Sequence, residues 1–513
     1  MLLAVGVTSA GRAGVTSAQS DAAFEAFWAA STRDGARLAA DAIAAGGASF
    51  DEVFSRLQAG RAYAKDVPTG VIRGTRRADG QDFFYSLQVP DGYDPGRRYP
   101  ARFELHGGIG AREDNRPRLD QGVGALAGDE PQIYVLPASW IDSPWWSEAQ
   151  VRNLAALLDV VKRTYNIDEN RVALSGVSDG GTAAFYVGMR DPTPYASFLP
   201  LIGSLMTLAG RTLALGDLFP NNLLNRPFFI VNGGRDLLYP TIQMDPVVRY
   251  LRSAGVSVVY LPQPDAGHDT TWWPEVKPSF EQFVREHPRN PLPDRLTWQR
   301  GEDDPFDRAH WLIVDRLGES GGPVLPDVNV IPTPPALQFG ARISGHRVTY
   351  VEPRSNAASL GLRSGDVVIG INEQALPQDT DLDWALTECC RPGAAVRLLV
   401  SRQGATVELK GIYEPGNTFG PTVPLFPRRK ASGRVDLVKT GNAVRVSTNG
   451  VTAYTLLLSP DAFDFTRPVT VTTNGIISFR GRVEKSLTTL LKWAAIDNDR
   501  AMLFGAELHL TVN

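Results

Sequence analysis

One serine of this chain lies where a sharp turn would expose its hydroxyl group. A short apolar strand, residues 171–175, runs into the segment 176–180, Gly-Val-Ser-Asp-Gly, and a helix-prone run begins at Thr182. The glycines on either side leave room, because a side chain there would collide with the strand or the helix. A hydroxyl held in this way, here that of Ser178, can attack a carbonyl carbon. The alternative is a plain glycine-rich turn, so the interpretation depends on the rest of the chain.

A second strand offers amide groups for a developing negative charge. It begins at Arg102 and ends in His106, Gly107 and Gly108. The backbone N–H of Gly107 or Gly108, together with that of Asp179 after the serine, would hold an oxyanion. Each such donor is typically worth on the order of 3 kcal/mol in a transition state. An ordinary β-turn is an equally good interpretation of the same three residues.

A carboxylate follows a third strand. Asp236 comes after the apolar run 227–231 and a glycine turn. A carboxylate in that place can orient an imidazole and stabilise its protonated form. The alternative is a cap for a helix that begins near Leu237. Asp265 and Asp269 are rival carboxylates, but both lie very near the candidate histidine in sequence.

The candidate base is His268, one of only six histidines in the chain. It lies in a loop directly after the predicted strand 256–260. His106 belongs to the glycine segment already described, and the other four lie at a helix end or in later segments. A neutral imidazole can take the serine proton and return it to a leaving group. The alternative for a lone loop histidine is an ordinary surface residue.

The order of these groups along the chain is informative. Ser178, Asp236 and His268 follow one another as the nucleophile, acid and base do in α/β-hydrolases. Residues 68–290 therefore resemble an α/β-hydrolase catalytic domain. They are most similar to prolyl-oligopeptidase-like serine hydrolases and to secreted esterases related to polyhydroxybutyrate depolymerases. The resemblance implies a catalytic triad of these three residues and the oxyanion hole described above, and it implies no particular substrate.

Elements of the right kind are expected to position these groups. Helices are predicted over 151–165, where apolar residues recur on one helix face, and over 279–286. Short apolar runs predict strands at 83–89, 133–136, 172–174, 199–202, 228–231 and 256–260. The alternation predicts an α/β fold, a doubly wound, mostly parallel sheet covered on both faces. Sites of such sheets lie at the carboxyl ends of the strands, where all the named residues fall.

The chain ahead of this unit is predicted to be helical over residues 21–67. Apolar side chains recur at helical spacing in 24–45 and in 50–64. We expect helices packed against the hydrolase unit, with a lid over the site as the alternative, because amphipathic stripes usually mean burial. Residues 1–20 are rich in small residues, and we expect an export-signal remnant or a disordered tail. The first of these, which we favour, predicts a secreted or periplasmic protein.

Residues 336–412 resemble a PDZ domain of the bacterial type. A small-residue helix is followed by Gly361-Leu, by Gly365-Asp and by a hydrophobic strand that ends at Asn372. PDZ domains bind extended peptide ends by adding them to a sheet edge, so a peptide C-terminus or extended segment is an expected partner. The expected carboxylate loop, 338–341, departs from the usual hydrophobic pattern. A structural or substrate-gating spacer is an equal alternative.

Two stretches around this unit are β-rich, residues 294–335 and 425–513. Asn-Gly turns at Asn449 and Asn474 predict hairpins. The second stretch resembles the β-sandwich tail of certain bacterial α/β-hydrolases, in which a Trp-Leu strand, here beginning at Trp311, belongs with the tail. We therefore expect one sandwich-like β-domain made of both stretches, with the PDZ-like unit inserted in it.

Length, charge and cysteine content limit the remaining possibilities. At 513 residues the chain is too long for one core, and its net charge of −4 without a basic stripe argues against nucleic acid as a partner. Without a run of about 18 apolar residues, no membrane span is predicted. Cys389 and Cys390 are adjacent and are the only cysteines. A vicinal bridge is strained, so we expect two reduced thiols, no metal site and no cofactor.

Five of the ten tryptophans follow strands at the expected catalytic edge. They are Trp140, Trp145, Trp146, Trp272 and Trp273. Buried packing is the alternative for each, but together they predict an aromatic wall for a bulky or polymeric acyl group. An ester is therefore the first substrate class expected, and a peptide cleaved by a prolyl-oligopeptidase-like peptidase is the second. A non-catalytic scaffold that binds peptides through its PDZ-like groove is the third hypothesis.

Overall fold

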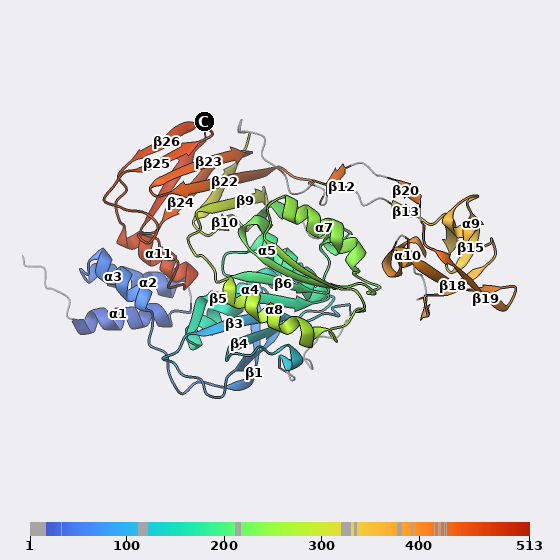
Figure 1. Ribbon diagram of the computed structural model, residues 1–513. Coiled ribbons are helices and arrows are strands. Elements are labelled where there is room, and N and C mark those ends of the chain that lie inside the picture. Colours follow the sequence, from blue (N-terminus) through green and yellow to red (C-terminus); the bar gives the residue numbers. More distant parts are fainter. Residues whose placement is uncertain are drawn as a thin grey trace, which may run out of the picture.

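The chain forms a central α/β body that is flanked by a β-sandwich on one side and by a smaller β-rich unit on the other (Figure 1). The computed structural model describes residues 17–31, 33–110, 119, 122–210, 217–319, 330–332, 336–376, 382–391, 393–414, 416–418, 422–424, 426 and 428–512. The predicted export-signal remnant, residues 1–20, lies outside these ranges except for its last four residues. Within them, the helices are too short or too polar to cross a lipid bilayer.

The central body is built on one eight-stranded sheet with the order β1-β2-β4-β3-β5-β6-β7-β8. Its strands are β1 (Gly70–Ala78), β2 (Gln81–Val89), β3 (Tyr99–Leu105), β4 (Ile133–Pro137), β5 (Ile167–Val177), β6 (Ser197–Leu201), β7 (Phe228–Gly233) and β8 (Val258–Gln263). The first two strands run antiparallel to their neighbours, and β4, β3, β5, β6, β7 and β8 are mutually parallel. This topology is that of the α/β-hydrolase fold, so the predicted fold class is confirmed.

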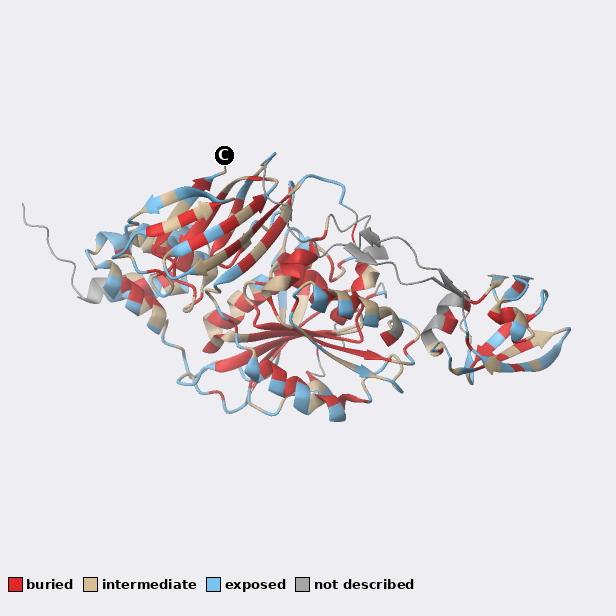
Figure 2. Cartoon of the chain, turned by 45° about the horizontal axis from the view of Figure 1, so that its top comes forward, coloured by how far each residue is buried: buried red, intermediate tan, exposed pale blue. Residues whose placement is uncertain are grey.

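Helices cover both faces of this sheet because its strands alternate their apolar side chains between two cores. In β7, Phe228 and Ile230 belong to one core, and Phe229 and Val231 belong to the other. The first core takes side chains from α4 (Glu148–Thr164), α5 (Asp179–Arg190), α6 (Leu205–Gly210) and α7 (Thr241–Ser253). The second takes them from α8 (Trp273–Glu286). Figure 2 shows the central strands of this sheet largely buried, which follows from this double cover, whereas the edge strands β1 and β8 keep exposed residues. Two short 3₁₀ turns, Gly124–Leu126 and Pro220–Asn225, complete the body.

The C-terminal unit is a sandwich of two antiparallel-rich sheets. The four-stranded sheet has the order β10-β11-β24-β27, and the five-stranded sheet has the order β26-β25-β23-β22-β9. The elements are β9 (Arg295–Gly301), β10 (Arg308–Ala309), β11 (Leu312–Leu317), β22 (Ser432–Thr440), β23 (Ala443–Asn449), β24 (Val451–Leu458), β25 (Val469–Thr473), β26 (Ile476–Gly481), α11 (Leu487–Asp497) and β27 (Ala506–Thr511). Strand β9 pairs with β22 and β11 pairs with β24, so strands from before and after the PDZ-like segment share both sheets.

The N-terminal helices pack mainly on the sandwich rather than on the hydrolase body. They are α1 (Ser17–Ala29), α2 (Arg33–Ala45) and α3 (Phe50–Ala59). Their apolar faces share a core with Leu490, Leu491 and Ala494 of α11. An amphipathic stripe shows that a helix is buried and leaves its partner undefined, which is why the expected partner differs from the observed one.

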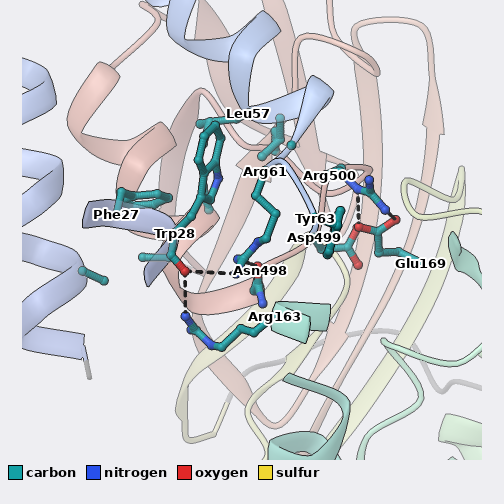
Figure 3. A pocket seen from close by; sticks show the side chains of 15 residues that line it. Phe27, Trp28, Leu57, Arg61, Tyr63, Arg163, Glu169, Asn498, Asp499 and Arg500 are labelled. Carbon is teal, nitrogen blue, oxygen red and sulfur yellow. Dashed lines mark hydrogen bonds and ion pairs between the residues drawn. The ribbon is translucent and has the colours of Figure 1, made fainter. Parts of the chain in front are cut away.

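Polar contacts tie this helical layer to the hydrolase body as well (Figure 3). The carbonyl of Trp28 in α1 accepts hydrogen bonds from Arg61 at 3.0 Å and from Arg163 of α4, in the hydrolase body, at 3.3 Å. Arg500 donates to Glu169 Oε1 of β5 at 2.6 Å, and both side chains are nearly buried. The cavity between them measures only about 30 Å³, so it is a junction of three units rather than a ligand site.

The PDZ-like unit lies at the far end of the molecule from the N-terminal helices (Figure 1). Its sheet has the order β14-β15-β16-β18-β19, with β17 paired to β16. The elements are β14 (Ala341–Ser344), β15 (Arg347–Val351), α9 (Asn356–Ser359), β16 (Val367–Ile371), β17 (Gln374–Ala375), α10 (Leu382–Cys389), β18 (Ala395–Arg402) and β19 (Ala405–Ile412).

A two-stranded stem joins this unit to the sandwich. In the stem, β12 (Val330–Pro332) pairs with β21 (Thr422–Pro424) and β13 (Ala336–Gln338) pairs with β20 (Gly416–Thr418). Helix α10 contacts α7 of the hydrolase body. The unit therefore meets the helix that follows the loop of Asp236.

Candidate active site

Ser178 occupies a strained turn between β5 and α5. Its backbone has φ 58° and ψ −117°, a region that side-chain-bearing residues rarely adopt. A Cβ atom at Gly176 would collide with the carbonyl of Gly180, and one at Gly180 would collide with the carbonyl of Leu105. The turn is therefore closed by backbone packing on both sides, and the serine remains half-buried at the carboxyl end of its strand.

The hydroxyl of Ser178 meets an imidazole and, beyond it, a carboxylate. Ser178 Oγ lies 2.8 Å from His268 Nε2, and His268 Nδ1 lies 2.8 Å from Asp236 Oδ2. The histidine side chain is 25% exposed, whereas that of Asp236 is fully buried. The other carboxylate oxygen, Oδ1, accepts the backbone N–H groups of Leu238 at 2.7 Å and Tyr239 at 3.0 Å. These bonds fix the carboxylate so that its other oxygen, Oδ2, faces the imidazole, and the Tyr239 and His268 rings pack with their centroids 5.5 Å apart and their planes at 71°.

The two rival carboxylates are engaged elsewhere. Asp265 forms an ion pair with Arg235 at 2.8 Å and is 86% exposed. Asp269 accepts the backbone N–H of Thr271 at 2.9 Å and also its hydroxyl. Of the three carboxylates considered from the sequence, Asp236 is the one that the structure brings to the ring nitrogen of His268.

The glycine segment after β3 lies directly against the serine. A Cβ atom at Gly107 would stand 2.7 Å from the Cβ of Ser178, so only glycine fits this approach. Gly108 has φ +70°, in the region that favours glycine. The carboxylate of Asp179 accepts the backbone N–H of Ile109 at 3.0 Å, which ties the segment to the start of α5. The first N–H groups of a helix have no acceptor within it, and there the helix dipole favours a negative charge.

His106 holds this segment through both ring nitrogens. Its Nε2 accepts the backbone N–H of Ser139 at 3.0 Å, and its Nδ1 lies 2.9 Å from the carbonyl oxygen of Gly107. Since the first partner can only donate and the second can only accept, the ring is neutral with its proton on Nδ1. Fixing the Gly107 carbonyl also fixes the direction of the Gly108 N–H in the same peptide plane. From the sequence, this histidine was assigned only to the loop, and its side-chain role was missed.

Four of the five predicted substrate-contacting tryptophans are buried. Trp145 is 1% exposed, and its indole N–H donates to the carbonyl of His106 at 2.9 Å. Trp146 is 5% exposed, and Trp272 and Trp273 are 6% and 5% exposed in the core under α8. Only Trp140 keeps part of its surface, with its ring 5.9 Å from that of Phe84. In the structure, then, Trp145 supports the glycine segment after β3, and these residues expose little aromatic surface.

A buried cluster of charged side chains lies on β3, the strand that leads into His106. Arg102 is fully buried and contacts Glu104 and Glu281, each at 2.7 Å. Burial raises the pKa of Glu104 to about 7, although the positive charge of Arg102 opposes the shift. Two carboxylates share one guanidinium, so holding one proton relieves the excess negative charge. The cluster therefore joins β3 to α8.

Another supporting residue, Asn232, was also missed from the sequence. Its side-chain amide donates to the carbonyls of Gly203 and Tyr239, both at 3.0 Å, and so joins the loops after β6 and β7. A polar residue at the end of an apolar strand is the signal that could have found it. Among the residues that the structure describes, no group of three or more His, Cys, Asp or Glu side chains has the arrangement of a metal site.

Comparisons with known proteins give one family match and several distant structural likenesses. Residues 332–410 match the family model of the PDZ domain. None of the curated proteins compared with the chain matches it. A thermostable esterase is similar at 21% identity and a TM-score of 0.36, over 43% of this chain and 63% of that chain. The chain thus spans less than two thirds of that esterase.

Two further solved structures show likeness of the same kind. The apo form of Thermogutta terrifontis esterase 2 has 15% identity and a TM-score of 0.34, over 42% of this chain and 94% of that one. Est1E from Butyrivibrio proteoclasticus has 16% identity and a TM-score of 0.32, over 42% of this chain and 98% of that one. With the strand order described above, the chain combines an α/β-hydrolase fold, a PDZ domain and further antiparallel sheets toward its C-terminus.

Proposed function

We propose that the chain is a serine hydrolase that works through an acyl-enzyme and that its substrates are carboxylic esters. The observation that carries the proposal is the pair of 2.8 Å contacts from Ser178 Oγ to His268 Nε2 and from His268 Nδ1 to Asp236 Oδ2. A serine in a strained turn, a half-buried imidazole and a buried carboxylate in this order form the arrangement that activates a hydroxyl nucleophile.

The reaction follows from these contacts. Ser178 Oγ attacks the ester carbonyl carbon while its proton passes to His268 Nε2. Asp236 stabilises the imidazolium, and the oxyanion is held by N–H groups of Gly107 or Gly108 and of Asp179. His268 then protonates the leaving alkoxide, and the acyl-enzyme remains. Water enters with the same base catalysis, attacks the acyl carbon and releases the acid and the serine hydroxyl.

We favour esters over peptides as substrates because ester cleavage needs less assistance to its leaving group. An alkoxide leaves more readily than an amine, which departs only after His268 protonates it. The aromatic support expected for a bulky or polymeric acyl group is reduced, since Trp140 alone of the five tryptophans keeps exposed surface.

A peptidase of the prolyl-oligopeptidase-like type is the second candidate, because it would use the same three residues. Paired assays on p-nitrophenyl acyl esters and on aminoacyl p-nitroanilides distinguish the two. Ester turnover that dominates and disappears in Ser178→Ala supports the first proposal. Dominant anilide turnover with the same dependence on Ser178 would favour the peptidase instead.

Peptide binding by the PDZ unit is a third candidate, which needs no catalysis. Strand β14 lies at one edge of its sheet, and α10 contacts β13, the strand that leads into β14. An extended peptide can add to such an edge. A scaffold of this kind would bind peptides equally well with Ser178 replaced by alanine, and it would hydrolyse neither substrate class.

A further inference from the structure

The only two cysteines of the chain form a pair at the end of α10. Cys389 is the last residue of this helix, and Cys390 follows it directly. Their Sγ atoms lie 2.8 Å apart, closer than two unrelated sulfur atoms would pack. Cys389 is half-buried and Cys390 is 4% exposed, so one sulfur is within reach of solvent and the other lies behind it.

A polar neighbour favours the ionised form of the inner thiol. Asn372 Nδ2 donates to Cys390 Sγ at 3.3 Å. The side-chain amide of Asn372 is itself fixed, because its Oδ1 accepts the backbone N–H of Arg397 at 2.9 Å. The backbone N–H of Asn372 also donates to the Arg397 carbonyl at 2.8 Å. The hydrogen bond between the sulfurs lowers the pKa of Cys390, burial raises it, and the Asn372 contact lowers it again, with a net lowering.

The outer thiol lines a cavity with basic walls. This cavity, of about 540 Å³, is also lined by Arg235, Arg397 and Lys410. The three cations have carboxylate partners: Asp265 pairs with Arg235, Glu408 with both Arg397 and Lys410, and Glu373, which lines the same cavity, also with Arg397. Nearby cations and access from solvent are the two conditions under which a cysteine reacts as a thiolate.

We propose that Cys389 and Cys390 are a redox-reactive dithiol, which hydroperoxides oxidise reversibly to a vicinal disulfide. The thiolate of Cys389 attacks the outer oxygen of the hydroperoxide, the O–O bond breaks, and an alcohol and a cysteine sulfenic acid are formed. Cys390 then attacks the sulfenic sulfur, the S–S bond forms and water leaves. Two thiols and one hydroperoxide thus give one disulfide, one alcohol and one water.

Geometry makes the oxidised form labile. Adjacent residues have Cα atoms only about 3.8 Å apart, below the range of about 4.4–6.8 Å in which disulfides are relaxed. A strained disulfide is more oxidising than a structural one and is returned to thiols by small dithiols. Its closure would also disturb the last turn of α10, where the Cys390 N–H donates to the Leu386 carbonyl at 3.0 Å. Helix α10 contacts α7, so the redox change would act at the junction of the PDZ unit and the hydrolase body.

Intact-mass measurement tests the proposal cleanly, because no third cysteine exists to pair with either thiol. The full-length protein is treated with a small excess of hydrogen peroxide and analysed before and after dithiothreitol. We expect a monomer lighter by two hydrogen atoms, with loss of both alkylatable thiols, and full recovery after reduction. Cys389→Ser and Cys390→Ser, treated in the same way, should never show this loss. A disulfide-linked dimer, stable oxygen addition or an unchanged mass in the wild type would each overturn the proposal.

A second variant tests the role of the amide neighbour. Asn372→Asp keeps an oxygen for the Arg397 N–H and replaces the donor at Cys390 by a negative charge. Disulfide formation after peroxide treatment should slow several-fold, because Cys390 attacks the sulfenic sulfur as a thiolate and loses its donor, while the circular dichroism spectrum stays unchanged. An unchanged rate in a folded Asn372→Asp protein would contradict the assigned activation of the pair.

Discussion

The backbone of Gly107 closes directly on the side chain of Ser178, with only 2.7 Å between the position of a Cβ on the glycine and the Cβ of the serine. The segment after β3 and the turn between β5 and α5, which are distant in sequence, are therefore in direct contact. The segment of Gly107 cannot move closer to Ser178, and no side chain can be inserted between them. The site is consequently sensitive to changes of a single methyl group.

Gly107→Ala tests this approach. The added methyl group must displace either the Ser178 side chain or the peptide that presents the amide donors, so kcat should fall about 100-fold, as when one oxyanion donor is lost. Gly110→Ala is the matched control, because no heavy atom of the residues that the structure describes lies within 4 Å of its added Cβ. Steady-state kinetics on a p-nitrophenyl ester measure both. Similar kcat values for the two variants would contradict the role given to Gly107.

Trp145→Phe tests the support behind the oxyanion segment. The change keeps an aromatic ring in the core and removes the N–H that donates to the His106 carbonyl. We expect kcat to fall roughly tenfold with little change in KM, because small misplacements of positioning groups act on the transition state. His106→Ala should have a larger effect in the same direction. A rise in KM with an unchanged kcat in Trp145→Phe would instead indicate a substrate-contacting role.

The sequence predicted the mostly parallel sheet, because its strands and turns are local patterns. The glycines around Ser178, the apolar run before Asp236 and the loop position of His268 are each visible within about ten residues. The directions of the loop tryptophans could not be predicted in the same way. Trp145 turns inward because the carbonyl of His106 accepts its N–H, and that contact joins residues far apart in the chain.

The sequence also could not show which part of the protein each amphipathic helix packs against. The helical stripe around Phe24 and Phe54 predicted burial, but the core that buries it includes Leu490 of α11, and that helix was not predicted. Long-range packing of this kind depends on shape and on the order in which whole units meet. The catalytic roles and the domain limits stay predictions, although the described geometry is compatible with them.

The raised pKa of Glu104 makes stability depend on pH. Between its ordinary pKa of 4.5 and about 7, the folded chain keeps the proton on Glu104 and the unfolded chain loses it. The free energy of unfolding should therefore decrease as pH rises through this window, by roughly 3 kcal/mol in total. Glu104→Gln removes this contribution, so its melting temperature should vary less between pH 4.5 and 7.5 than that of the wild type. Parallel curves for the two proteins would show that Glu104 is ionised throughout.

Excision of the PDZ unit tests how far catalysis depends on it. Pro332 and Thr422 are paired in the stem, so a short Gly-Ser turn between them can replace the residues from 333 to 421. If the unit only recruits substrate, the shortened protein should cleave small p-nitrophenyl esters at a kcat/KM within about threefold of the full chain. A loss of turnover in a folded product would mean that the contact of α10 with α7 supports the loop of Asp236.

The central claim is that the hydroxyl of Ser178 is activated by His268. Reaction with a fluorophosphonate probe, followed by peptide mass spectrometry, tests it most directly, because the probe reacts only with an activated serine and needs no knowledge of the substrate. We expect one adduct, on the peptide that contains Ser178, with labelling abolished in Ser178→Ala, nearly abolished in His268→Ala and reduced in Asp236→Asn. Absence of an adduct on the folded wild-type protein, or labelling that persists unchanged in His268→Ala, would contradict the account.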